Sequence, residues 1–281
     1  MILLIDNYDS FVFNVEQYLR ELTNEEVKTV RNDAITLEEI KILNPSRIVL
    51  SPGPKHPKDS GICLEILKNI EDIPILGICL GHQAFGLVFD GKIEKLETPL
   101  HGKTSEITLT DKNSILFKDM PEKFNVMRYH SLYVSEENLP EELTVTAKSD
   151  DGIIMALEHK TKDIYGIQFH PESFFTEYGK NIIKNFISNI KKETLQSNDK
   201  NTEETERKKA DKVFKKYLKK LQDNRRKQML FAASSQSSKQ EGILARLLAI
   251  FAKRGCQQEK EISEFPSSHQ GQWFDHPSGN S

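Results

Sequence analysis

The 281-residue sequence predicts an α/β fold in which a mostly parallel sheet is covered by helices on both faces. Two observations support this prediction. Up to about residue 90, short apolar runs alternate with segments whose apolar residues recur at helical spacing, as in strands and helices wound around a parallel sheet. The first of these apolar runs, residues 2–5, has the composition of a strand buried on both faces.

Four strands and four helices are expected in this first part. The strands are residues 2–5, 27–30, 48–50 and 75–78, and the helices are residues 11–22, 36–43, 62–70 and 81–89. Ser10 is expected to cap the first helix, because serine side chains accept hydrogen bonds from free amides of a first turn. One face of that helix would carry Phe11, Val15, Tyr18, Leu19 and Leu22.

From residue 92 to 169 the pattern changes to short strands separated by turns. The expected strands are residues 107–109, 124–127, 143–147, 153–157 and 164–169, and a last helix is expected at 177–190. Residues 1–190 therefore form one domain of ordinary size.

The rest of the chain has a different charge. Residues 191–281 carry 19 Lys and Arg against 12 Asp and Glu, although the whole chain has a net charge of −3. We expect a linker at 191–206 and a basic, partly helical and partly disordered extension at 207–281, with a basic amphipathic helix at 207–227 and an apolar one at 242–254. The basic helix could bind nucleic acid, an anionic membrane or an acidic protein, or be a solvated extension without function.

Composition favours a cytoplasmic protein. Hydrophobic residues make up 37% of the chain, no run is long enough to cross a membrane, and the start lacks the features of a signal peptide. The three cysteines, Cys63, Cys79 and Cys256, are too few and too scattered for a disulfide framework. A free thiol would therefore be available for chemistry in a reducing compartment.

Cys79 lies between Gly77 and Gly81, where an expected strand meets an expected helix. Glycine on both sides is typical of a sharp strand-to-helix turn that exposes a nucleophile, because side chains there would collide with the neighbouring strand and helix. The helix N-terminus would favour the thiolate, and the amide of Leu80 could donate to an oxyanion. A buried core cysteine between two glycines is the alternative.

A thiolate mechanism also needs a histidine and a group to orient it. His170 ends an apolar strand, and Glu172 lies two residues further on, facing the same way in extended chain. His101 and His130 lie in expected loops and remain possible bases. The two strand-end signals together predict a triad of Cys79, His170 and Glu172 at one edge of the sheet.

The sequence resembles the class I, or triad-type, glutamine amidotransferases. The two matching signatures are Gly-Ile-Cys-Leu-Gly-His-Gln at 77–83 and Gln-Phe-His-Pro-Glu-Ser at 168–173. Further motifs resemble the glutaminase subunits of anthranilate synthase and aminodeoxychorismate synthase: Asp-Asn-Tyr-Asp-Ser-Phe at 6–11, Ser-Pro-Gly-Pro at 51–54, His-Gly-Lys at 101–103 and Tyr-His-Ser-Leu at 129–132. The opening at 1–11 and Arg-Asn-Asp at 31–33 lean toward the aminodeoxychorismate type. The resemblance covers residues 1 to about 190.

The resemblance implies a flavodoxin-like amidotransferase fold with a mixed, mostly parallel sheet. It implies that Cys79 attacks glutamine, that His170 transfers protons and that Glu172 orients it. Amides of Gly53 and Leu80 would form the oxyanion hole. The positions that hold the substrate's α-carboxylate and α-amino groups would be Gln83, Ser131 and Leu132.

The family also implies a partner, a chorismate-binding synthase subunit, in a heterodimer or larger complex that makes 4-amino-4-deoxychorismate or anthranilate. No cofactor is expected, and any metal would belong to the synthase. Lys55 departs from the family, which often has Gly there, and this puts activity without the partner in doubt. The alternatives are another thiol hydrolase or amidotransferase glutaminase, disfavoured by the motif at 6–11, and a catalytically silent binding protein, disfavoured by the intact triad.

Overall fold

The structure, a computed structural model, describes residues 1–188, 208–209, 211–220, 222–223 and 226–227. Residues Met1–Leu221 belong to one compact unit. The predicted linker and the predicted apolar helix at 242–254 lie outside the described residues.

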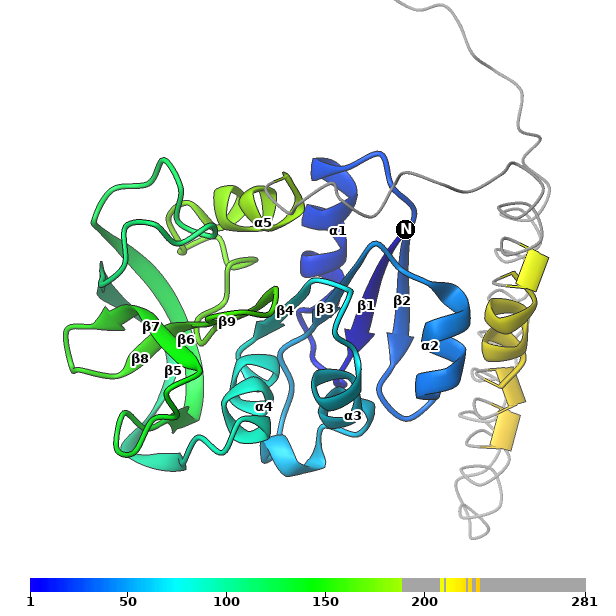
Figure 1. The fold of residues 1–281 in the computed structure, drawn as a ribbon, viewed down its shortest axis with the longest axis horizontal. Helices are drawn as coiled ribbons and strands as arrows, with labels where there is room; N and C mark the ends of the chain where they lie inside the picture. Colours follow the sequence, from blue (N-terminus) through cyan, green and yellow to red (C-terminus); the bar gives the residue numbers. More distant parts are fainter. Residues whose placement is uncertain (189–207, 210, 221, 224–225, 228–281) are drawn as a thin grey trace, which may run out of the picture. The chain divides into compact units, whose positions relative to one another are not determined.

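A single nine-stranded sheet forms the centre of the unit, in the order β2-β1-β3-β4-β9-β8-β7-β5-β6 (Figure 1). Its first five strands are parallel, and the remaining four run antiparallel to their neighbours. The strands are β1 (Ile2–Asp6), β2 (Val27–Arg31), β3 (Arg47–Leu50), β4 (Ile75–Ile78), β5 (Ile93–Leu109), β6 (Lys123–Val134), β7 (Leu143–Ser149), β8 (Ile154–His159) and β9 (Ile164–Ile167). The mixed sheet with flanking helices expected from the sequence is confirmed, with four parallel and four antiparallel strand pairings.

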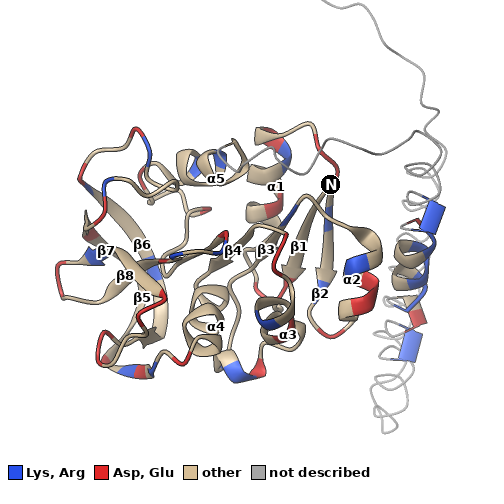
Figure 2. Cartoon of the chain, viewed as in Figure 1, with Lys and Arg blue, Asp and Glu red and all other residues tan. Residues whose placement is uncertain are grey.

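Helices cover both faces of the parallel half. On one face α1 (Val12–Leu22) lies beside α5 (Gly179–Ser188), and on the other lie α2 (Leu37–Leu43), α3 (Ile62–Asn69) and α4 (Leu80–Val88), with a short 3-10 turn at Pro57–Asp59 (Figure 1). Each face has its own apolar core. Figure 2 shows the central strands nearly free of charged residues, as required where a strand is buried on both sides.

The predictions for two strands and one helix cap were wrong. Strand β6 continues to Val134, beyond the predicted 124–127, so His130 lies on this strand and His101 lies on β5, although loops were expected at both. Strand β5 begins at Ile93 rather than at residue 107, because its first part is a polar and largely exposed arm paired with β6, which no apolar pattern marks. Helix α1 begins at Val12, and its cap position Phe11 makes no side-chain hydrogen bond, so Ser10 does not cap it. The buried face is made by Val12, Val15 and Leu19, while Phe11 is 42% exposed.

Part of the predicted basic helix is described: residues 211–220 are helical and rich in Lys (Figure 2). Tyr217 is 6% exposed, and its hydroxyl accepts a hydrogen bond from the backbone amide of Arg31 on the edge strand β2, at 3.2 Å. The ring of Phe214 lies 4.5 Å from Nζ of Lys28. Leu218, predicted on the same apolar side, is 43% exposed instead.

No helix within the described part of the chain is long and apolar enough to span a membrane.

Candidate active site

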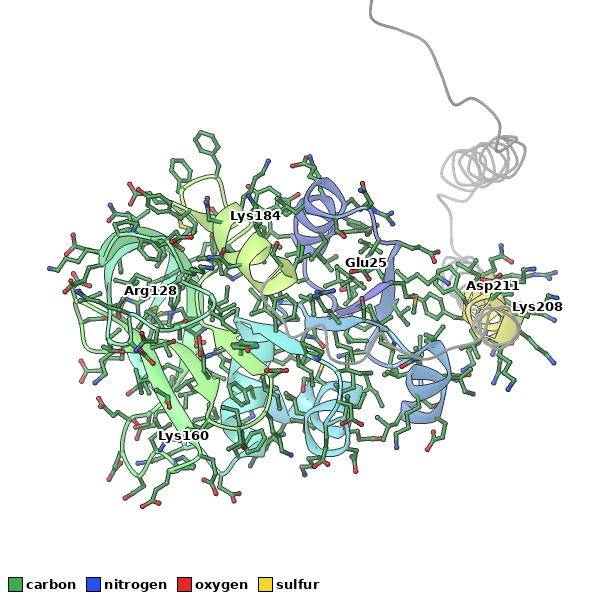
Figure 3. All side chains as sticks on the ribbon, turned by 45° about the horizontal axis from the view of Figure 1, so that its top comes forward. Glu25, Arg128, Lys160, Lys184, Lys208 and Asp211 are labelled. Carbon is green, nitrogen blue, oxygen red and sulfur yellow. The ribbon has the colours of Figure 1, made fainter. Side chains whose placement is uncertain are left out.

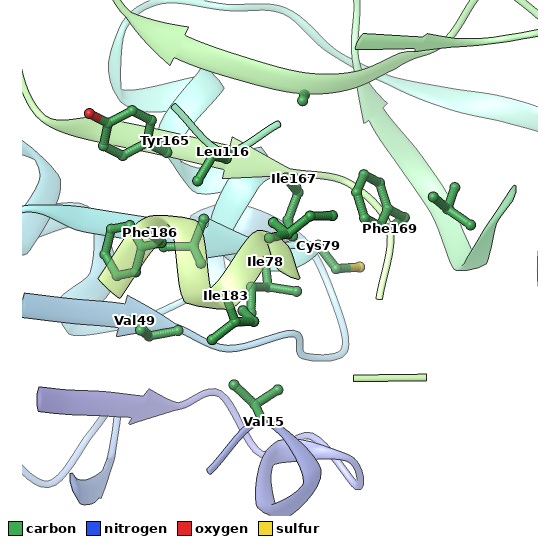
Figure 4. Packing of buried hydrophobic residues seen from close by; sticks show 14 of the residues in the cluster. Val15, Val49, Ile78, Cys79, Leu116, Tyr165, Ile167, Phe169, Ile183 and Phe186 are labelled. Atoms are coloured by element: carbon green, nitrogen blue, oxygen red, sulfur yellow. The ribbon is translucent and has the colours of Figure 1, made fainter. Parts of the chain in front are cut away.

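Cys79 occupies a strained turn between β4 and α4. Its φ of 51° and ψ of −99° are conformations that side chains other than glycine rarely adopt. A Cβ on Gly77 would lie 2.5 Å from the backbone of Gly81, and one on Gly81 would lie 2.5 Å from the carbonyl oxygen of Leu50. Both glycines are therefore required by contact with backbone atoms, as the sequence pattern predicted. Figure 4 shows Cys79 at the end of the apolar cluster, with its sulfur directed away from Ile78.

His170 and Glu172 lie beside this turn because β9 pairs with β4 in the sheet. The amide of Cys79 donates to the carbonyl of Ile167, the last residue of β9, at 2.8 Å. Three residues further on, Nδ1 of His170 lies 2.6 Å from Oε1 of Glu172, and both side chains are buried. The structure therefore brings together the three residues predicted to form the triad.

The electrostatics of His170 suit proton transfer. Burial alone would lower its pKa, but the adjacent Cys79 and Glu172 outweigh burial and raise the pKa well above its ordinary value. Nδ1 is held by Glu172, and Nε2 is buried without a hydrogen bond to any described residue, so Nε2 is the atom left for proton transfer. The rings of Tyr129 and Phe11 meet the imidazole edge to face, with centroids 5.1 and 6.4 Å away.

The predicted oxyanion donors lie next to Cys79, Leu80 at the start of α4 and Gly53 on the loop after β3. Leu80 is the first residue of α4, where an amide has no partner within the helix. A Cβ on Gly53 would lie 2.6 Å from Cβ of Asn7 and 2.8 Å from the side chain of Leu80, so only glycine fits between them. Asn7 also fixes the start of this loop, because its amide and its side chain both donate to Ser51.

Lys55, the departure from the family pattern, is exposed and has a φ of 72°. This left-handed conformation is free of strain only for glycine. The loop after Gly53 thus keeps a shape suited to glycine even though the residue has changed.

The predicted glutamine-binding residues gather on the other side of the cysteine. Nε2 of Gln83 donates to the carbonyl of Leu132 at 2.8 Å and to Oε1 of Gln168 at 3.1 Å, and Gln83 is buried. Ser131 and Leu132 are partly exposed on β6. With both N–H groups of Gln83 used, only its Oε1 is left for a ligand.

His101 and His130, the two other histidines that the sequence allowed as possible bases, are not part of the triad. His101 is exposed beside the ring of Tyr129. His130 is held in a separate hydrogen-bonded group, between Arg128 and the carbonyl of Leu132.

Gln168 was not predicted as a site residue, although it lies within the second signature motif. Its Nε2 lies 3.6 Å from Sγ of Cys79, and its side chain is fully buried. The only sequence signal is its place two residues before His170, and that spacing alone does not reveal contact with a cysteine 89 positions away. The described residues contain no group of three His, Cys, Asp or Glu side chains that could hold a metal ion.

Cys79 thus lies on a strand-to-helix turn beside a buried His–Glu pair, at the edge of a sheet covered by helices. This arrangement defines a class of α/β proteins in which a cysteine thiol is placed to act as a nucleophile. The model of the family described as glutamine amidotransferase class-I matches residues 3–190. The chain belongs to this family and is a glutamine amidotransferase.

Curated relatives give similar matches over the same region. The chain is 52% identical over 190 residues to anthranilate synthase component 2 of Cyanophora paradoxa, covering 67% of this chain and 98% of that one. It is 47% identical over 196 residues to aminodeoxychorismate/anthranilate synthase component 2 of Bacillus subtilis strain 168, covering 69% and 100%. The bifunctional protein TrpGD of Thermotoga maritima is 50% identical over 189 residues, which are 66% of this chain but 32% of that protein.

Among solved structures, the crystal structure of a candidate GMP synthase subunit from Thermoplasma acidophilum has a TM-score of 0.57 at 30% identity. The match covers 66% of this chain and 91% of that chain. The class I amidotransferase fold expected from the sequence is therefore confirmed.

Proposed function

We propose that this protein is a glutaminase subunit that hydrolyses L-glutamine to glutamate and ammonia, and delivers the ammonia to a chorismate-using synthase. The product of the synthase would be 4-amino-4-deoxychorismate or anthranilate. The observation that carries the proposal is the buried pair of His170 and Glu172, 2.6 Å apart, beside the strained turn of Cys79. The names of the relatives, which are component 2 subunits of these two synthases, supply the partner.

In the first half of the reaction, the Cys79 thiolate attacks the side-chain carbonyl carbon of glutamine. Negative charge develops on the carbonyl oxygen, which the amides of Gly53 and Leu80 stabilise. His170, protonated at Nε2, then gives its proton to the amide nitrogen, the carbon–nitrogen bond breaks, and ammonia leaves. A γ-glutamyl thioester remains on the sulfur.

In the second half, neutral His170 accepts a proton from water at Nε2, and the resulting hydroxide attacks the thioester carbon. The carbon–sulfur bond breaks, and glutamate leaves. The thiolate and the protonated imidazole are restored together. Glu172 stabilises the imidazolium through Nδ1 in both halves, which agrees with the raised pKa of His170.

The substrate's amino-acid end would lie against Gln83, Ser131 and Leu132. Because both N–H groups of Gln83 donate within the protein, its Oε1 is suited to accept from the α-ammonium group. The exposed backbone around Ser131 would hold the α-carboxylate.

The test is ammonia release from glutamine by the wild type and by Cys79→Ser, each with and without a chorismate-binding synthase subunit from the same source. The wild type should release ammonia with the synthase present, and Cys79→Ser should not. A wild-type protein that releases no ammonia in the presence of the synthase would refute the proposal. The aromatic product formed with chorismate then identifies the acceptor pathway as folate or tryptophan synthesis.

A further inference from the structure

A hydrogen-bonded chain runs from the ion pair of exposed Asp151 and buried Arg128, at the sheet's antiparallel half, to the sulfur of Cys79. Arg128 on β6 is labelled in Figure 3, and the chain continues through residues on β6, on α4 and directly after β9. Its members, in order, are Asp151, Arg128, His130, the carbonyl of Leu132, Gln83, Gln168 and Cys79.

The direction of the first part is set by Arg128, because a guanidinium only donates hydrogen bonds. Arg128 is 1% exposed, and its Nη1 donates to Asp151 and to Ser105, each at 3.0 Å. Its Nε donates to Nε2 of His130 at 3.0 Å, so Nε2 carries no proton. The proton of the neutral ring is then on Nδ1, which donates to the carbonyl of Leu132 at 3.0 Å.

The direction of the second part is set by the carbonyl of Leu132, because a carbonyl only accepts. Gln83 must present its NH₂ group there, at 2.8 Å. The other N–H of the same group points to Gln168 at 3.1 Å, so Gln168 must present its oxygen to Gln83. The NH₂ group of Gln168 is thereby turned toward Sγ of Cys79, at 3.6 Å.

Burial makes this direction stable. Gln168 is fully buried and Gln83 is 3% exposed, so water cannot replace a lost partner for either amide. Turning either amide over would place two N–H groups or two oxygens against each other in the protein interior, where unsatisfied polar groups are costly.

We propose that Gln168 is a catalytic residue whose side-chain N–H donates to the Cys79 thiolate, and that Gln83 is a positioning residue that fixes the orientation of Gln168. The proposal rests on the proposed function, since it concerns the nucleophile of that reaction. A hydrogen bond donated to a charged group is stronger than one donated to a neutral group, so Gln168 would hold and orient the thiolate for attack.

The test is the rate of alkylation of Cys79 by iodoacetamide, measured across pH without glutamine or partner. A Cys256→Ser background removes the tail thiol. Cys63 does not interfere, because it is fully buried and burial raises the pKa of its thiol to about 12. Gln168→Leu should lower the alkylation rate at pH 7 about tenfold, and the rate should recover toward the wild-type value as the pH rises.

Matched variants separate the donor from mere packing. Gln168→Glu keeps an oxygen for Gln83 but puts an oxygen against the sulfur, so it should also lower the rate at least tenfold. The same change at an exposed glutamine, Gln17→Leu, should leave the rate unchanged. Gln83→Leu removes the amide that orients Gln168 and should lower the alkylation rate at pH 7 severalfold, with the same recovery as the pH rises.

Wild-type alkylation rates in Gln168→Leu would overturn the proposal. If Gln168→Leu does not fold, Gln168→Glu, which has the same shape as glutamine, decides, and a wild-type rate in that variant would overturn the proposal. A wild-type rate in Gln83→Leu would overturn the positioning role of Gln83. Failure of the proposed function would be a separate result. If the protein releases no ammonia with the synthase but its alkylation rate still depends on Gln168, the hydrogen bond from Gln168 to Cys79 is supported and the glutaminase function is not.

Discussion

Replacing Gly81 with alanine would place a methyl carbon 2.5 Å from the carbonyl oxygen of Leu50 and 3.1 Å from its carbonyl carbon. An ordinary contact of this kind is about 3.4 Å or longer. Both opposing atoms belong to the backbone of the central strand β3, so helix α4 must retreat by roughly 1 Å. Its first residues would move with it, including Leu80 and the turn at Cys79.

A displacement of about 1 Å in a catalytic group costs on the order of 100-fold in rate. Overpacking of this kind also costs about 1–3 kcal/mol of stability. We therefore expect Gly81→Ala to lower kcat for ammonia release, in the presence of the synthase, about 100-fold. Urea unfolding should show the loss of stability in the same protein.

The control is Gly152→Ala. Gly152 has a φ of +79°, so alanine there costs about 1–2 kcal/mol of stability, but nothing lies within 4 Å of the added carbon. This variant should lose stability and keep the wild-type kcat. A Gly81→Ala protein with wild-type kcat would refute the argument that the glycine positions the nucleophile.

Three further predictions follow from the same structure. Glu172→Gln removes the carboxylate that raises the pKa of His170, so kcat for glutamine hydrolysis should fall about 10- to 100-fold with little change in KM; an unchanged kcat would contradict the orienting role. Lys55→Gly relieves a left-handed φ of 72° and should raise the free energy of unfolding in urea by about 0.5–1 kcal/mol, net of the greater freedom of glycine in the unfolded chain; a loss of stability would contradict this. In the folded protein, burial and then the guanidinium of Arg128 lower the pKa of His130 to about 4. Below pH 6.5, the imidazole of His130 is therefore protonated more readily in the unfolded chain than in the folded protein. Its contribution to stability is present above pH 6.5 and should fall by about 2 kcal/mol by pH 4.5, and His130→Asn should show a shallower decline in urea titrations over that range.

The parallel half of the sheet could be predicted from the sequence because each of its strands is buried on both faces. A run such as residues 75–78 has no polar positions, and it ends at a cysteine flanked by glycines. The position of His170 could be predicted for the same reason, since it follows another such strand. Local composition therefore indicated where the proposed nucleophile and its proposed base lie in the sheet.

The missed features depend on contacts between distant segments. The first part of β5 is polar and exposed, and it becomes a strand only because β6 pairs with it. Phe11 has helical spacing with the apolar face of α1, but it lies at the cap position and contacts His170 instead. Gln168 contacts Gln83 and Cys79, 85 and 89 positions away, and no sequence period reports such a pair.

The position of β9 has a consequence for the order in which the chain can fold. Strand β4 ends at the nucleophile early in the sequence, but its neighbour in the sheet is made of residues 164–167, after the whole antiparallel half has been synthesised. Contacts over such separations form late, because a long loop must close first. A nascent chain that has emerged only through α4 therefore carries Cys79 without His170 or Gln168. Under the proposed mechanism, the reactive centre is completed only when nearly the entire domain has left the ribosome, and an incomplete domain would lack the base of the proposed reaction.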